Sequence, residues 1–175
     1  MFDMQNRMEW LFLFILWLGT RGYTRCVDSY RIGMAVKTAE NEFFKLAEQG
    51  CTDRLRFASG NSTDECLYFG PMSTANVSNP DPDGLIQAQM IEQVLANDRI
   101  DGLAISVRNA LVLGPVIQSA IAQGIPVITF DSDAPDSDRV AYVGTDNYFL
   151  GTTMAKVAQQ ISPDGGTFAC VIANT

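Results

Sequence analysis

The sequence has no histidine among its 175 residues. Histidine is the side chain best suited to acid–base catalysis near neutral pH, and it is the usual activator of serine and cysteine nucleophiles. It is also one of the main zinc ligands. Its absence therefore excludes histidine-dependent hydrolases and histidine-ligated metal sites.

Clusters of basic residues are absent as well. The chain has 12 Lys and Arg against 20 Asp and Glu, which gives a formal net charge of -8 and a pI near 4.4. Such a charge would repel a phosphate backbone, so we expect no nucleic-acid partner. The first strand-like segment is followed by "KTAENEFF". Because this segment lacks glycine, it fits neither a phosphate-binding loop nor a dinucleotide-binding turn.

The N-terminus contains an apolar run at residues 10–18. Its length is typical of the hydrophobic part of a signal peptide and is too short to span a bilayer comfortably. We expect residues 1–25 to be a signal peptide, with an N-terminal anchor or a buried helix as alternatives. Residues 26–175 would then form one globular lobe, since 47% of the chain is hydrophobic and 18% is charged.

The four cysteines contain no CxxC pair, which makes a zinc or thioredoxin-type motif improbable. Export would favour a disulfide instead. Cys51 and Cys66 flank a polar segment and are the best candidates for a pair. Two reduced thiols are the alternative.

Short apolar runs alternate with amphipathic segments along the chain, as in proteins with helices between buried parallel strands. The pattern predicts an α/β fold with three layers and a doubly wound, mostly parallel sheet. The expected strands are 30–36, 65–70, 101–106, 125–130, 140–144 and 166–173, and the expected helices are 41–57, 81–98, 109–124 and 147–162.

Ligands of open α/β sheets bind beyond the carboxyl ends of the strands, so the segments that follow the strands are the candidate sites. One of them, "DSDAPDSD", is rich in carboxylates. It is a poor calcium loop, because Asp136 stands where an EF-hand needs glycine and Tyr142 stands where it needs glutamate. A glycosidase would need a second, correctly spaced acid, which the sequence does not establish.

A small polyhydroxy ligand suits these segments better. Carboxylates and amides can bind neighbouring hydroxyl groups, and aromatic rings can pack on the C–H face of a sugar. Asn41, Phe43, Phe44 and Asp131 form such a set. The alternative for the two phenylalanines is that they are core residues at the start of a helix.

The motifs "YRIGMAVKTAENEFF", "DPDGLIQAQMIEQVL", "DGLAIS" and "IPVITFDSDAPDSDRVAYVGTDN" resemble the N-terminal lobe of periplasmic sugar-binding proteins of the ribose- and galactose-binding type. That lobe also resembles the effector domain of LacI-type repressors. The resemblance implies a periplasmic-binding-protein-like type I fold. Because the sequence lacks histidine, a phosphate-binding loop and a plausible metal cage, we also expect no catalysis, cofactor or metal. It implies ligand contacts from residues on three of the segments that follow strands, namely Asn41, Phe43, Phe44, Ser106 and Asp131, with Asp133 as a further candidate.

Three residues depart from the family pattern. Ser132 stands where ribose-type proteins commonly have arginine, Glu42 replaces a usual proline, and Lys37 stands where a small polar residue is frequent. The resemblance therefore leaves the identity of the sugar open.

Members of this family have two similar lobes, and we expect this chain to supply one. The resemblance implies a solute-binding protein for ABC-type sugar uptake, located in the periplasm or outside the cell. Its partners would be a sugar or polyol, an ABC permease and a C-terminal lobe. The alternatives are a ligand-sensing ectodomain of a receptor or regulator and, third, a sugar-processing enzyme.

Overall fold

A five-stranded parallel sheet lies at the centre of the structure, a computed structural model that describes residues 29–60, 63–73 and 81–169. Its strands lie in the order β2-β1-β3-β4-β5, and each neighbouring pair is parallel. Their bounds are Arg31–Ala35 (β1), Glu65–Phe69 (β2), Gly102–Ile105 (β3), Val127–Phe130 (β4) and Ala141–Val143 (β5). The central strand β3 is buried along its whole length, as a strand covered on both faces must be.

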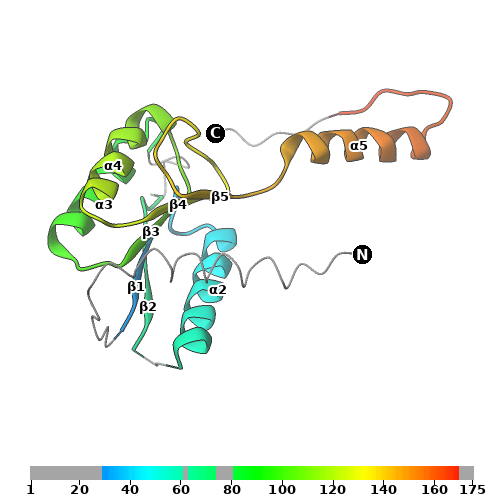
Figure 1. The fold of residues 1–175 in the computed structure, drawn as a ribbon. Helices are drawn as coiled ribbons and strands as arrows, with labels where there is room; N and C mark the ends of the chain where they lie inside the picture. The colour runs from blue at the N-terminus through cyan, green and yellow to red at the C-terminus, as the bar shows by residue number, and fades with distance from the viewer. Residues whose placement is uncertain (1–28, 61–62, 74–80, 170–175) are drawn as a thin grey trace.

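Helices cover both faces of this sheet (Figure 1). Helix α2 (Glu42–Ser59) packs on one face, and α3 (Leu85–Asn97) and α4 (Ala110–Ala122) pack together on the other. Asn41 and Asn109 are the N-caps of α2 and α4, and each side chain accepts a backbone N–H. Helix α3 begins after Gly84, and Asp81 accepts the N–H groups of its first turn from the preceding loop. The predicted three-layer, doubly wound architecture is confirmed.

Two apolar clusters lie on opposite faces of the sheet. The larger one fills the space between the sheet and α3 and α4, and Ile91, Leu113 and Ile117 are fully buried in it. The smaller one contains Met34 and Phe44 under α2. Neighbouring residues of β1 point to opposite faces, which places them in different clusters.

The connections change direction beside β1. From β1 the chain moves outward to β2 by way of α2, and it then returns past β1 to β3 by way of α3 on the other face. Ligands of doubly wound sheets bind at such a reversal, beyond the carboxyl ends of the two strands that flank it. In this protein those strands are β1 and β3.

The C-terminal end of the described chain agrees with the prediction in one element and differs in the other. Helix α5 (Asn147–Ile161) forms as expected but has no buried residue, and it extends away from the sheet (Figure 1). Of the last predicted strand, residues 166–169 are described and are not in a strand, whereas 170–173 lie outside the described residues. The apolar residues Phe149, Met154 and Val157 of α5 are all exposed, so this helix does not contribute to the layers that cover the sheet.

The predicted signal peptide or anchor at residues 1–25 lies outside the described part of the chain. Within that part, no helix combines the length and apolar character that crossing a membrane requires.

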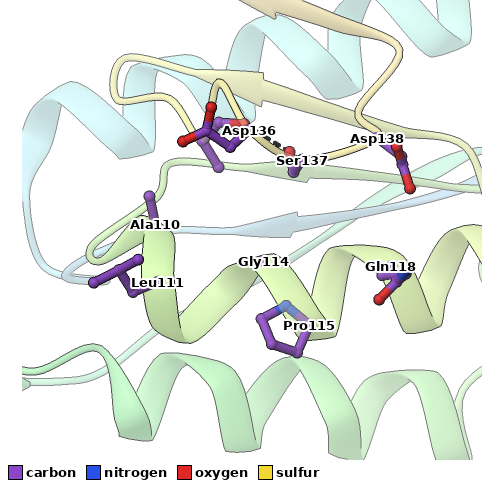
Figure 2. Close-up of a pocket in the computed structure, with 9 residues that line it drawn as sticks. Ala110, Leu111, Gly114, Pro115, Gln118, Asp136, Ser137 and Asp138 are labelled. Carbon is purple, nitrogen blue, oxygen red and sulfur yellow. Dashed lines mark hydrogen bonds between the residues drawn. The ribbon is translucent and has the colours of Figure 1, made fainter.

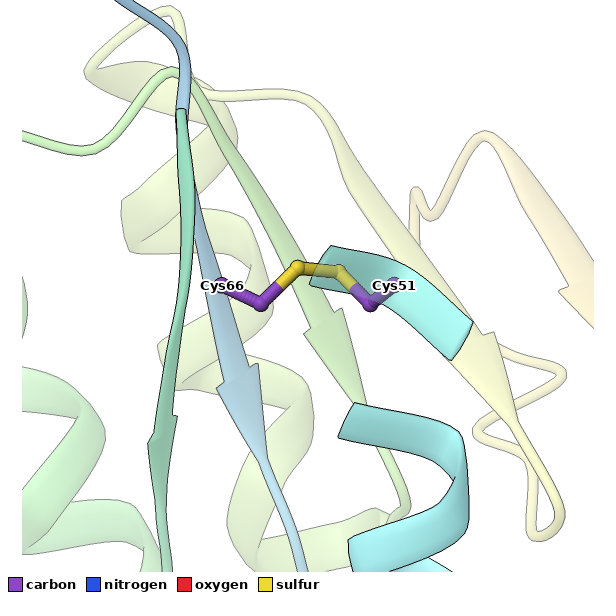
Figure 3. Close-up of a disulfide and its surroundings, with 2 residues drawn as sticks. All are labelled: Cys51 and Cys66. Atoms are coloured by element: carbon purple, nitrogen blue, oxygen red, sulfur yellow. A yellow bond between two sulfur atoms is a disulfide. The ribbon is translucent and has the colours of Figure 1, made fainter. Parts of the chain in front are cut away.

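A disulfide joins Cys51 of α2 to Cys66 of β2 (Figure 3). The two Cα atoms are 6.2 Å apart, within the normal range for such a bond. The structure thus confirms the predicted pair. The bond fastens α2 to the edge strand of the sheet, on the face where that helix is the only cover among the described elements.

We expect the double substitution of Cys51 and Cys66 to alanine to lower the free energy of unfolding by about 2–4 kcal/mol, because the bond closes a short loop and thereby restricts the unfolded chain. Urea unfolding of the oxidised protein and of the variant measures the difference. Reducing agent should destabilise the parent protein by a similar amount and leave the variant unchanged. Equal stability of the oxidised and reduced parent protein would contradict this role.

Candidate functional site

The candidate site lies beyond the carboxyl ends of β1, β3 and β4. Ala35 pairs with Ile105, and Ile105 pairs with Thr129, so the three strands end at nearly the same level. Beyond this level the backbone continues the alignment, since Ser106 N donates to Ala35 O at 2.9 Å and Val107 N donates to Ser132 O at 3.2 Å. The side chains that follow the strands therefore converge on one place.

Asp131 is at the centre of this group. Its Oδ2 accepts a hydrogen bond from Ser106 Oγ at 2.9 Å and pairs with Lys37 Nζ at 3.0 Å. Lys37 also contacts the Ser132 hydroxyl. These polar side chains come from three different strand ends, and 34% of the Asp131 side chain is exposed. Asp131 therefore presents a carboxylate that is held in place but open to solvent.

The backbone at Asp131 is unusual. Its φ is 60°, and it is the one non-glycine residue with positive φ among the described residues. Aspartate tolerates this conformation better than most residues do, although it still carries some strain. Val143 O accepts the Asp131 N–H at 3.1 Å, and the Tyr142 hydroxyl donates to the Asp131 carbonyl at 2.9 Å. Strained residues held by their surroundings occur often at binding sites.

Arg108 connects the end of β3 to the end of β1. Its Nη2 donates to the carbonyl of Lys37 at 3.2 Å and to Thr38 Oγ1 at 3.3 Å. The buried Gln87 of α3 supports this segment from below, because it accepts from Arg108 N and donates to Ser106 O. The segment between β3 and α4 is thus fixed by side chains from two other elements.

Asp133 serves a different purpose from Asp131. Arg139 approaches it with Nε and Nη2, the latter 2.6 Å from Oδ2, and Thr129 Oγ1 and Ala134 N also donate to it. The Arg139 guanidinium is the main cause that lowers the pKa of Asp133 to about 2. Both carboxylate oxygens are engaged within the loop, so in this structure Asp133 acts as a clamp beneath Asp131.

The start of α2 separates the three residues predicted there. Asn41 is the N-cap, and its Oδ1 accepts from Phe43 N at 3.0 Å. Phe43 is 55% exposed, whereas Phe44 is 4% exposed and packs edge to face on Phe130. The core interpretation therefore applies to Phe44, and Phe43 is the aromatic ring with a face available to a ligand.

A separate pocket of about 320 Å³ lies between α4 and the loop that follows Asp133 (Figure 2). Leu111 and Pro115 line one side of it, and Asp136 and Asp138 lie on the other. None of the predicted ligand residues lines this pocket. The described residues also contain no group of three or more side chains suited to a metal ion.

Comparison with known proteins settles the family. The family model described as "Periplasmic binding protein domain" matches residues 32–175. The chain belongs to the periplasmic binding protein domain family. The relatives described next confirm the predicted resemblance of this chain to periplasmic sugar-binding proteins.

Two curated relatives are D-xylose-binding periplasmic proteins. The protein from Haemophilus influenzae is 34% identical over 92 residues, which are 53% of this chain and 27% of the relative. The protein from Escherichia coli is 34% identical over 82 residues, which are 47% of this chain and 24% of the relative. This periplasmic binding protein domain thus aligns with about a quarter of each curated relative.

Solved structures of solute-binding proteins share the fold. A protein from Burkholderia graminis, solved in complex with D-arabinose, is 28% identical with a TM-score of 0.59, over 75% of this chain and 41% of that one. The arabinose-binding protein AraP from Geobacillus stearothermophilus is 26% identical with a TM-score of 0.64, over 79% of this chain and 43% of that one. The fold described above corresponds to less than half of these binding proteins.

Sequence reasoning missed Arg108 and Gln87 as parts of the site. Arg108 was within reach of the sequence, because it lies in the segment "SVRN" directly after a predicted strand. Gln87 had no such signal, since a glutamine within an amphipathic helix is usually a surface residue. Lys37 was noted as a departure from the family pattern, and the structure places it against Asp131.

The Asp133–Arg139 pair should make stability depend on pH. The ordinary pKa of the Asp133 carboxyl is 3.8, and folding lowers it to about 2, so the pair stabilises the protein above about pH 4. This contribution is lost as the pH falls from about 4 to about 2. Allowing for partial solvation, it amounts to about 1–2 kcal/mol. Urea unfolding at several pH values should show a weaker pH dependence in Asp133→Asn than in the parent protein.

Asp138→Asn is the matched control, because Asp138 lies on the same loop and is exposed. It should retain the parent protein's pH dependence. The role of the clamp would be refuted by an Asp133→Asn variant whose stability falls just as steeply between pH 4 and pH 2.

Proposed function

We propose that this chain forms one wall of the sugar-binding site of a solute-binding protein for ABC-type uptake. The observation that supports this most strongly is the position of Asp131. Its solvent-accessible carboxylate follows β4 and is held by Lys37 and Ser106, which follow the two strands that flank the reversal of the sheet. The curated relatives bind D-xylose by name, and one solved relative contains D-arabinose.

The predicted residues would have distinct roles in binding. Asp131 would accept hydrogen bonds from neighbouring sugar hydroxyls, and the side-chain amide of Asn41 would donate to another. Phe43 would pack against the C–H face of the sugar ring. Ser106 is fully buried and would orient Asp131, while Asp133 would fix the loop behind it. Phe44 would support the ring of Phe43, which it meets edge to face.

The same proposal covers location and partners. The named relatives are periplasmic, which supports a periplasmic or extracellular location for this chain. The similarity to a solute-binding protein of an ABC transporter supports an ABC permease as the protein partner. We propose that the chain catalyses no reaction, because its relatives are binding proteins and the Asp131 carboxylate is held by Lys37 and the Ser106 hydroxyl.

The affinity of the isolated chain should be modest. Binding sites that enclose a small ligand bury about 70–90% of its surface. The edge described here offers one side of such an enclosure, and the binding proteins that share the fold are more than twice as long as the part that aligns. Residues beyond this lobe would supply the opposite wall.

Titration calorimetry should detect D-xylose or D-arabinose binding to this chain with a Kd of about 1 mM, compared with the roughly micromolar values of fully enclosed sites. Asp131→Asn preserves the shape and the favoured backbone conformation of the residue but removes the charge. It should weaken binding at least about tenfold, because a charged acceptor is replaced by a neutral one.

Asp136→Asn is the control, since Asp136 lines the separate pocket beside α4. It should bind like the parent protein. Loss of binding in Asp136→Asn together with unchanged binding in Asp131→Asn would move the site to that pocket. Turnover of a sugar by the parent protein would instead favour the enzyme interpretation.

A further inference from the structure

We propose that the ligand of this site is an acidic sugar, a sugar or polyol that carries a carboxylate, and that Arg108 binds the carboxylate. This inference rests on the proposed sugar-binding function and narrows it to a ligand class. It follows from the position of Arg108, a cation at the carboxyl edge of the sheet that pairs with no carboxylate among the described residues.

The other cations that the structure describes at this edge each pair with a carboxylate. Lys37 pairs with Asp131 at 3.0 Å, and Arg139 pairs with Asp133. At the start of α2, Lys45 pairs with Glu42 at 2.7 Å. Glu40, on the same segment, accepts the backbone N–H of Ser73.

Arg108 is the exception. Within the described residues, no carboxylate lies within 4.0 Å of its guanidinium group, and its protein partners are the neutral oxygens of Lys37 and Thr38. Its Nε is buried and has no hydrogen-bond partner in this part of the chain. Holding a cation in this way is unfavourable, because buried donors normally have acceptors. An anionic group of the ligand would supply the missing counter-charge.

The surroundings of Arg108 also favour an anion. Helices α2, α3 and α4 all follow strands of the parallel sheet, so their N-terminal ends, which carry partial positive charge, lie at this edge. Lys37 lies between Arg108 and Asp131, since its carbonyl accepts from Arg108 and its ammonium group pairs with Asp131. A ligand could thus place hydroxyl groups on Asp131 and a carboxylate on the side of Arg108.

Arg108 also braces the segment after β1, and a bracing role alone would not create a preference for charge. The two roles are separated by comparing ligands that differ only in charge. D-Glucuronate and D-glucose share a ring and differ at one carbon, as do the open-chain pair D-gluconate and D-glucitol. The measurement is the affinity of the 175-residue chain for each compound, obtained by calorimetry or ligand-observed NMR at low salt.

We expect at least one acid to bind about tenfold more tightly than its neutral counterpart, as charged hydrogen bonds allow. The preference should shrink as sodium chloride is raised from about 20 mM to about 500 mM. Arg108→Gln should abolish this preference, so that the acid and its neutral counterpart bind the variant with equal affinity. The control is Arg99→Gln, which also removes one positive charge and should keep the preference. Arg99 lies beside Asp101, just before the start of β3 and therefore at the opposite edge of the sheet.

Lys37→Met provides a second test if Arg108→Gln does not fold. It removes the neighbouring charge and should reduce the preference for the acid about threefold. Equal or tighter binding of the neutral compounds by the parent protein would overturn this inference while leaving the sugar-binding proposal intact. If neither acids nor neutral sugars bind, the proposed function fails and the inference fails with it.

Discussion

The parallel pairing of β1 with β3, and of β3 with β4, is the constraint on which the rest of the site depends. Because Ala35, Ile105 and Thr129 lie in register, the three strands end together, and Lys37, Ser106 and Asp131 meet although up to 94 residues separate them in sequence. Burial of β3 between two layers of helices holds this register, since a slip of one residue would turn every side chain of β3 to the other face and disrupt the close packing on both faces. A shift in the pairing would therefore separate all the polar groups of the site.

The acidic loop shows how neighbouring carboxylates acquire different roles. Asp133 has both oxygens engaged by Arg139, Thr129 and Ala134, which lowers its pKa and stiffens the loop. Asp131 lies two residues earlier, in a backbone conformation that turns it toward Lys37 and Ser106, and keeps part of its surface exposed. The first carboxylate stabilises the loop, and the second is available to a ligand.

Much of the fold could be predicted from the sequence, because strands buried on both faces are continuous apolar runs and helices carry an apolar stripe. The helix predicted at 109–124 is observed at Ala110–Ala122, for example. Periodicity does not reveal what covers an apolar stripe, so the exposed position of α5 could not be foreseen. The roles within the site could not be predicted either. The role of Asp133 depends on the position of Arg139 in the folded loop. Phe43 and Phe44 are neighbours in sequence, and only their positions around the helix make the first exposed and the second buried.

The central claim is that the carboxyl edge at β1, β3 and β4 binds the sugar, rather than the pocket beside α4. Backbone NMR of the 15N-labelled chain during addition of a sugar tests it most directly, because each amide reports on its own surroundings. The account predicts saturable shifts at Lys37, Thr38, Val107, Arg108, Asp131 and Ser132, whose segments form this edge. Shifts confined to Leu111, Gln118 and Ser137 around the pocket, with the edge unchanged, would contradict it.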